Sequence, residues 1–119
     1  MNKQELMDRT KNFAIAIILL LKKYPNNTEF KIIQNQIIRS STSVGANYRA
    51  ACRAKSSPDF INKLKIVEEE LDETIYWLEI LQRLSPQNFQ EQLIKAKMEG
   101  NQLLAIFVKS IKTLRLRKS

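Results

Sequence analysis

The side chains best suited to bind a metal ion or transfer protons are seven carboxylates within residues 59–83. They are Asp59, Glu68, Glu69, Glu70, Asp72, Glu73 and Glu79. Helical bundles can hold two metal ions between inward-facing glutamates and Glu-x-x-His pairs on facing helices. This chain contains no histidine and no second acid-rich segment. We therefore expect no metal site, and we expect these acids to form a solvated or salt-bridged helix face.

Other catalytic arrangements also lack the residues they need. A nucleophile activated by histidine is excluded, and a Ser-Lys or paired-carboxylate site needs a cleft that a bare bundle rarely offers. The two glycines, Gly45 and Gly100, lie too far apart to form a phosphate-binding loop. Cys52 follows two alanines, a context in which a packed thiol is the ordinary role. The sequence thus predicts no catalytic residue, no cofactor and no enzymatic activity.

Basic residues dominate the overall charge. The net charge of +8 and the pI near 9.8 favour a polyanionic partner, with a merely soluble basic protein as the plain alternative. Two groups of bases are candidates for contacts with nucleic-acid phosphates. They are Arg39, Arg49 and Arg53, on one side of a single helix, and Lys109, Lys112, Arg115, Arg117 and Lys118, near the C-terminus. Alternatively, this basic surface meets the acidic helix of a neighbouring copy, so that charge serves assembly.

Three prolines, Pro25, Pro58 and Pro86, separate the segments that position these side chains. Proline breaks a helix interior but is tolerated in the first turn, so each proline marks a boundary. Apolar residues recur at spacings of three and four between these boundaries. The pattern predicts helices over about residues 2–24, 29–55, 58–84 and 86–114, with a frayed basic end. Short connections force antiparallel neighbours, so we predict a single all-α domain over residues 1–119, an antiparallel up-down-up-down four-helix bundle.

Local signals mark the helix starts. Asn2 is a predicted cap of the first helix, with Glu5 three residues on. Ser57 and Ser85 are the predicted caps of the third and fourth helices, because each precedes a proline.

The first helix carries more apolar surface than a four-helix monomer needs. The second half of this helix is apolar on nearly every side, Gly45 lies in a run of small residues, and Trp77 borders the apolar seam of the third helix. We therefore expect a homo-oligomer. Its predicted interface residues are Ile15, Ile18, Leu19, Leu21, Gly45 and Trp77.

The apolar run Phe13–Leu21 is too short to cross a bilayer, which needs about 20 residues. Two lysines follow it at once without a small-residue cleavage pattern, so we expect neither a signal peptide nor a membrane partner. A single cysteine is compatible with a reducing compartment. The expected location is the cytoplasm.

Three motifs give the chain a resemblance to a known family. They are RSSTSVGANY at residues 39–48, AKSSPDF at 54–60 with Lys63-Leu64 after it, and ETIYWL at 73–78. Over about residues 36–81 the chain resembles the bacterial four-helix bundle proteins named after the 23S ribosomal RNA intervening sequence, the S23-type proteins. The resemblance implies a bundle that assembles as a ring, with five subunits as the family expectation, and a poorly defined biochemical role. Members often carry a glutamate where this chain has Ala50, so its second helix is more basic.

These observations lead to one functional hypothesis and one alternative. We expect a non-enzymatic, oligomeric bundle that binds structured RNA or DNA through backbone contacts with its basic surface. The alternative is an adaptor or scaffold that binds other proteins through its apolar first helix and through acid-base complementarity. Charge reversal of Arg49 and Arg53 is expected to abolish nucleic-acid binding in the first case and the oligomer in the second.

Overall fold

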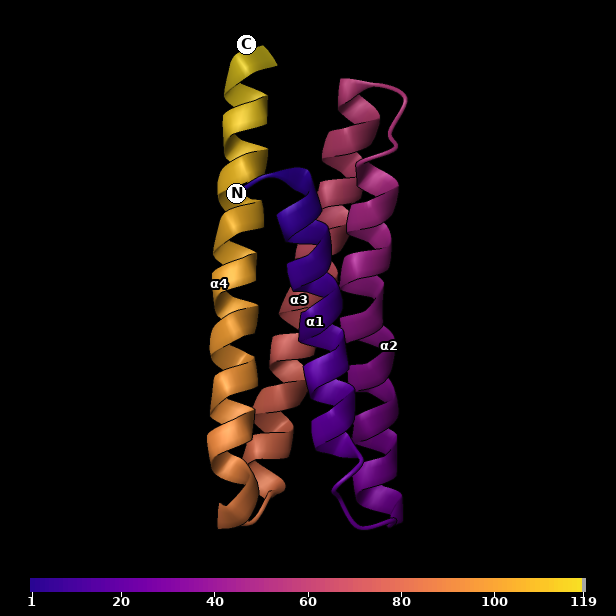
Figure 1. The fold of residues 1–119 in the computed structure, drawn as a ribbon, viewed down its shortest axis with the longest axis vertical. Coiled ribbons are helices and arrows are strands. Elements are labelled where there is room, and N and C mark those ends of the chain that lie inside the picture. Colours follow the sequence, from indigo (N-terminus) through magenta and orange to yellow (C-terminus); the bar gives the residue numbers. More distant parts are fainter. Residues whose placement is uncertain (119) are drawn as a thin grey trace.

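The structure, a computed structural model, describes residues 1–118 and the side chains of residues 1–117. Its helices are α1 (Lys3–Leu21), α2 (Thr28–Ala51), α3 (Ser57–Leu84) and α4 (Gln87–Lys118), and the described residues contain no strand. Successive helices run in opposite directions (Figure 1). The predicted all-α, up-down-up-down four-helix bundle is therefore confirmed.

Side-chain caps fix the starts of three helices. In each, a side-chain oxygen accepts a hydrogen bond from the backbone N–H three residues on, at 2.8 to 3.2 Å: Asn2 from Glu5, Asn27 from Phe30 and Ser56 from Asp59. Such caps are each worth about 1 kcal/mol. The prediction for Asn2 is confirmed, whereas the cap of α3 is Ser56 and not Ser57, because α3 begins one residue earlier than predicted.

The other predicted cap, Ser85, ends α3 instead of starting α4. Its hydroxyl donates to the Leu81 carbonyl at 2.6 Å and lies 2.5 Å from the Tyr24 hydroxyl. The ring of Tyr24 stacks on Phe89, with 3.9 Å between the ring centroids. Ser85 therefore ties the turn after α1 to the turn before α4.

Three helix ends differ from the prediction. α1 stops at Leu21 and α2 at Ala51, before the predicted ends at residues 24 and 55. Beyond each end one amide still bonds to the carbonyl four residues back, and the next two bond to carbonyls three residues back, in a tighter turn. α4 instead passes the predicted end at residue 114 and continues to Lys118, so the basic end is helical.

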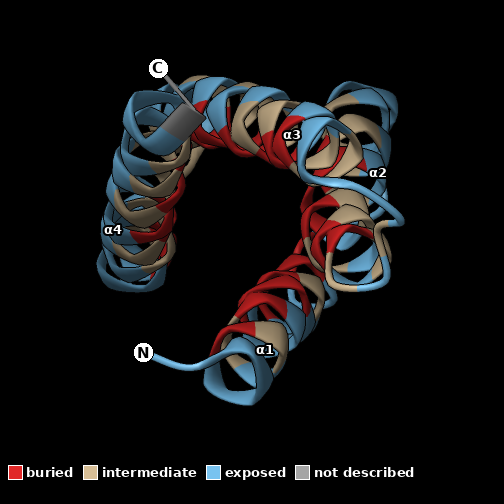
Figure 2. Ribbon diagram, turned by 90° about the horizontal axis from the view of Figure 1, so that it is seen from above, coloured by how far each residue is buried: buried red, intermediate tan, exposed pale blue. Residues whose placement is uncertain are grey.

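The core is lined by the predicted apolar stripes, including Phe13 and Ile17 of α1, Val44 of α2, Leu71 of α3 and Phe107 of α4. Neighbouring helices in the chain pack together, α1 with α2, α2 with α3 and α3 with α4, and the remaining neighbouring pair, α1 and α4, has the least contact of the four. Seen end-on, the four helices therefore leave one side of the bundle open, between α1 and α4 (Figure 2). None of the described helices has both the length and the apolar character needed to cross a membrane.

Candidate functional site

The alternating helix directions gather the basic residues in one half of the bundle. The half with both chain ends comprises residues 1–12, 41–69 and 101–118 (Figure 1). The boundary between the two halves is placed at the height along the bundle at which Arg39 pairs with Glu70. This half carries thirteen of the twenty lysines and arginines but five of the twelve acids, whereas the other half carries seven of each. The whole formal charge of +8 thus belongs to what we call the basic half.

A groove of about 830 Å³ runs between α1 and α2, mostly in this half, and extends beyond it to Ala14, Ile15 and Ile18 on α1. Apolar or small side chains line its floor: Met7, Ala14, Ile15, Ile18, Gly45 and Ala46. Four bases and one acid form its rim: Lys3, Lys11, Arg49, Arg53 and Asp8. Arg49 and Arg53 are exposed, and neither forms an ion pair with any described residue. The structure therefore places two of the predicted phosphate-binding arginines at the edge of an apolar groove.

The second predicted basic group lies on the last turns of α4. Lys109, Lys112, Arg115 and Arg117 are all exposed, and the side chain of Lys118 lies outside the described residues. This end of α4 projects past the N-terminus of α1 (Figure 1). Because α2 and α4 lie diagonally across the bundle and meet through core side chains such as Tyr48 and Phe107, the two predicted groups share the basic half but lie on different sides of it.

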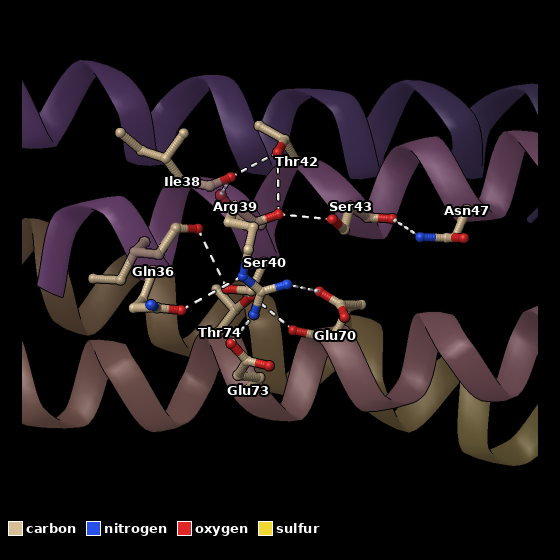
Figure 3. A network of polar contacts seen from close by, with 12 residues as sticks. Gln36, Ile38, Arg39, Ser40, Thr42, Ser43, Asn47, Glu70, Glu73 and Thr74 are labelled. Atoms are coloured by element: carbon tan, nitrogen blue, oxygen red, sulfur yellow. Dashed lines mark hydrogen bonds and ion pairs between the residues drawn. The ribbon is translucent and has the colours of Figure 1, made fainter. Parts of the chain in front are cut away.

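Arg39 is held differently from the other bases. Its guanidinium is half-exposed, but it pairs with Glu70, at 3.5 Å between Nη1 and Oε2, and with Glu73 (Figure 3). Trp77 Nε1 donates to the same carboxylate of Glu73 at 3.1 Å. Arg39 therefore joins α2 to α3 in what we call the Arg39 clamp. This placement removes Arg39 from the unpaired bases with which the sequence grouped it.

The Arg39 clamp shifts its two carboxyl groups in opposite directions. The hydrogen bond from Arg39 lowers the pKa of Glu73, and the hydrogen bond from Trp77 adds to the effect. Burial raises the pKa of Glu70 in spite of the nearby guanidinium. Glu73 is thus the firmly charged partner of Arg39, and the clamp is an ion pair that fixes how α2 lies against α3.

Beneath the clamp, two fully buried hydroxyl groups join the same helices. Thr74 Oγ1 donates to Ser40 Oγ at 2.8 Å. The hydroxyls of residues 40–43 also donate to backbone carbonyls three or four residues back (Figure 3). No buried side-chain nitrogen or oxygen among the described residues lacks a hydrogen-bond partner. The serine-rich motif therefore serves helix packing and offers no activated nucleophile.

Four of the seven acids of α3 take part in ion pairs, in agreement with the predicted solvated or salt-bridged face. Besides the Arg39 clamp, Asp59 pairs with Lys63 at 3.0 Å, and Glu68 pairs with Lys65 at 2.7 Å. The hydrogen bond from Lys63 lowers the pKa of Asp59. Within the described part of the chain, no three Cys, Asp or Glu side chains are grouped so that they could hold a metal ion.

The predicted interface residues of α1 separate into exposed and buried ones. Ile15 and Leu19 are 47% and 54% exposed. Ile18 is half-buried and lines the groove between α1 and α2. Leu21 lies in the core, 4% exposed, because it follows Ile17 by one turn on the inner face. Its side chain is therefore not available to a neighbouring subunit.

Gly45 and Trp77, the other predicted interface residues, make contacts within the chain. A Cβ atom added to Gly45 would lie 3.4 Å from Thr10 Oγ1 and 3.5 Å from the Lys11 nitrogen, so this glycine lets α2 approach α1. Trp77 is half-buried and belongs to the Arg39 clamp.

A second groove, of about 840 Å³, lies between α1 and α4 at the open side of the bundle. Arg9 crosses this side and pairs with both carboxylate oxygens of Glu99 at 2.7 Å, and it also donates to Gln102 at 2.9 Å. Acids and bases line this groove in equal number: Glu5, Asp8 and Glu99 with Arg9, Lys23 and Lys95. Its rim therefore carries no net charge.

The sequence predicted neither the partners of Arg39 nor the lysines of the groove rim. A signal for the clamp exists, because residues equally far from the turn meet in a helical hairpin. Arg39 and Glu73 lie equally far from Ser56, the cap between α2 and α3. The contribution of Lys3 and Lys11 depends on how α1 packs against α2, which this rule does not give.

The fold and these sites define an antiparallel four-helix bundle with one basic half and a clamped α2–α3 pair. The sequence model of the family described as "23S rRNA-intervening sequence protein" matches residues 2–108, and the chain belongs to this family. A crystal structure of a protein of unknown function from the S23 ribosomal protein family, from Bacteroides thetaiotaomicron, is 37% identical with a TM-score of 0.80. The alignment covers 94% of this chain and 99% of that chain. Comparison with curated proteins gives no match. The resemblance is confirmed, and it extends well beyond residues 36–81.

Proposed function

We propose that this protein is a non-enzymatic nucleic-acid-binding bundle that holds the backbone of structured RNA or DNA against its basic half. The observation that carries the proposal is the concentration of the whole net charge of +8 in that half. Bases that neutralise phosphates release counterions, so such binding is strong, independent of sequence and sensitive to salt.

The proposed phosphate contacts are the unpaired, exposed bases. Arg49 and Arg53 lie four residues apart on α2, so their side chains emerge from the same face about one turn apart. The bases at the end of α4 form the other proposed contact. The described aromatic residues of the basic half are buried or half-buried, which favours contacts with the backbone over stacking on unpaired bases.

A salt titration tests this proposal. Binding of a duplex RNA is measured between about 50 and 200 mM salt for the wild type and for Arg49→Gln/Arg53→Gln. Each lost phosphate contact lowers the slope of log K against log salt by about 0.9, so the double variant should lose about 1.8. Arg39→Gln is the matched control, because its guanidinium is already paired, and its slope should not change. A wild type whose binding does not depend on salt would contradict the proposal.

We also propose that the protein associates with itself, as the ring of five subunits that is the family expectation. The observation in favour is the apolar surface left on α1 and α4, where Leu19, Ile94 and Met98 are 54%, 43% and 56% exposed. Native mass spectrometry should give a multiple of 13.9 kDa, and Leu19→Glu should reduce it. A particle of one chain at all concentrations would exclude this assembly.

A further inference from the structure

The groove between α1 and α2 has the dimensions of a helix-binding site. On α1 its lining runs from Lys3 to Ile18, and on α2 from Thr42 to Arg53. At 1.5 Å per residue the α1 wall is about 22 Å long, which matches a helix of about four turns. Ile15 is 47% exposed at the floor of this groove and is not needed for the core. The length and the free apolar floor suit an elongated partner.

The shape of the floor also favours a helix. Ala14 of α1 and Ala46 of α2 both lie on the floor, and their short side chains leave a hollow along the line where the two helices meet. Small residues allow helices to pack at short interaxial distances. A partner helix can therefore lie in the hollow with its apolar side chains against Ile15 and Ile18, as in other complexes in which an amphipathic helix fills a groove.

The rim selects the charge of that helix. The rim carries four bases, Lys3, Lys11, Arg49 and Arg53, and a single acid, Asp8, so its net charge is three positive charges. Arg49 and Arg53 have no ion-pair partner among the described residues. The groove between α1 and α4 is similar in size, but its rim has no net charge. Charge complementarity therefore distinguishes the α1–α2 groove from its neighbour and calls for acids on both edges of the partner.

We propose that the α1–α2 groove binds an acidic amphipathic helix of a partner protein, with its apolar face on Ile15 and Ile18 and its carboxylates against Arg49 and Arg53. This inference goes beyond nucleic-acid binding and does not depend on it. When a partner helix occupies the groove it takes up Arg49 and Arg53, and the bases at the end of α4 stay free for a nucleic acid, so the protein can act as an adaptor between the two.

The test uses a labelled helical peptide of about 15 residues, with leucines along one face and glutamates along both edges of that face. A peptide with lysines in place of the glutamates and a scrambled peptide of the same composition are the controls. Fluorescence anisotropy should show binding of the acidic peptide alone. Arg49→Glu/Arg53→Glu should weaken that binding by more than tenfold and should gain binding of the lysine peptide.

Two variants test the position of the peptide. Ala46→Trp fills the floor and should reduce binding by more than tenfold. Ala105→Trp places the same residue at an exposed alanine of α4, outside the groove, and should bind the peptide like the wild type. Thermal unfolding of both variants, followed by circular dichroism, shows that each is folded. Equal binding of the scrambled peptide, or unchanged binding by Ala46→Trp, would overturn the proposal.

Two other occupants of the groove have their own signatures, and either would overturn the proposal. If Ala46→Trp abolishes binding of a duplex RNA while the acidic peptide does not bind, the groove belongs to nucleic acid. If Ala46→Trp, but not Ala105→Trp, converts an oligomer to single chains, a second copy occupies it. Arg115→Gln/Arg117→Gln should weaken binding of the duplex RNA and leave binding of the peptide unchanged. If this variant binds the duplex RNA like the wild type, the nucleic-acid proposal fails while the peptide proposal still stands.

Discussion

Replacing each glycine with alanine tests how closely the helices approach one another. Both glycines lie inside helices, where alanine is favoured over glycine by about 1 kcal/mol. At Gly45 the added Cβ would lie 3.4 Å from Thr10 Oγ1 and 3.5 Å from the Lys11 nitrogen, which is ordinary van der Waals contact. Gly45→Ala should therefore keep most of the stabilisation that alanine gives over glycine inside a helix. We expect its free energy of unfolding to rise by about 0.5 to 1 kcal/mol.

At Gly100 the same change meets the core. The added Cβ would lie 3.2 Å from Ile75 Cγ1 and 3.4 Å from Phe13 Cζ. One of these side chains must move, and such overpacking costs about 1 to 3 kcal/mol. After the helix gain of about 1 kcal/mol is subtracted, the free energy of unfolding of Gly100→Ala should be unchanged or lower by up to about 2 kcal/mol.

Urea unfolding followed by far-ultraviolet circular dichroism measures both free energies, with the fluorescence of Trp77 as a second probe. In a domain of this size a change of 1 kcal/mol moves Tm by about 3 to 5 °C, so thermal unfolding ranks the two variants independently. A Gly45→Ala variant that is less stable than Gly100→Ala would refute the predicted order of packing. That order would mean that α1 and α2 are packed more tightly than the core around Ile75.

Three further predictions concern polar contacts between helices. Thr74→Val removes the buried hydroxyl that donates to Ser40 and should lower the free energy of unfolding by about 1 to 2 kcal/mol in urea; an unchanged value would contradict this. Glu73 has a lowered pKa in the folded protein. Its contribution to the free energy of unfolding is therefore fully present above its unfolded pKa of about 4.3 and is lost as the pH falls through the folded pKa. The stability advantage of the wild type over Arg39→Gln should therefore shrink between about pH 5 and pH 3, and a constant difference would count against the clamp. Arg9→Met removes the partly exposed pair with Glu99 and should cost at most about 1 kcal/mol, less in high salt; a larger loss at high salt would exclude an ionic origin.

The helices and their core faces were predictable, and their ends were less so. Proline positions and apolar spacing depend on local backbone chemistry, so they identified all four segments. The last turns of α1 and α2 tighten through hydrogen bonds to carbonyls three residues back, which apolar spacing does not reveal. The fraying predicted after Leu114 was wrong for a reason visible in the sequence. Leucine, arginine and lysine are good helix formers, and bases suit the negative end of a helix.

The candidate site shows what a helical wheel leaves out. Arg39, Arg49 and Arg53 share one arc of α2, so the sequence treated them as equivalent. In the structure only Arg39 lies opposite the acids of α3, whereas the other two lie past the acid-rich turns, where α2 borders the groove with α1. The wheel gives the direction of a side chain on its own helix, and the facing helix decides whether that side chain is paired.

Arg49 and Arg53 belong to both proposals, so charge reversal alone does not distinguish a phosphate backbone from an acidic helix. A change at the floor of the groove distinguishes the two partners. A nucleic-acid backbone that touches the rim tolerates Ala46→Trp, because this change leaves every base in place. A helix that rests on Ile15 and Ile18 does not tolerate it, because the indole occupies the hollow. Since α4 lies on another side of the bundle, its bases can be changed without touching this floor. Filling the groove and removing the bases of α4 therefore test the two partners separately.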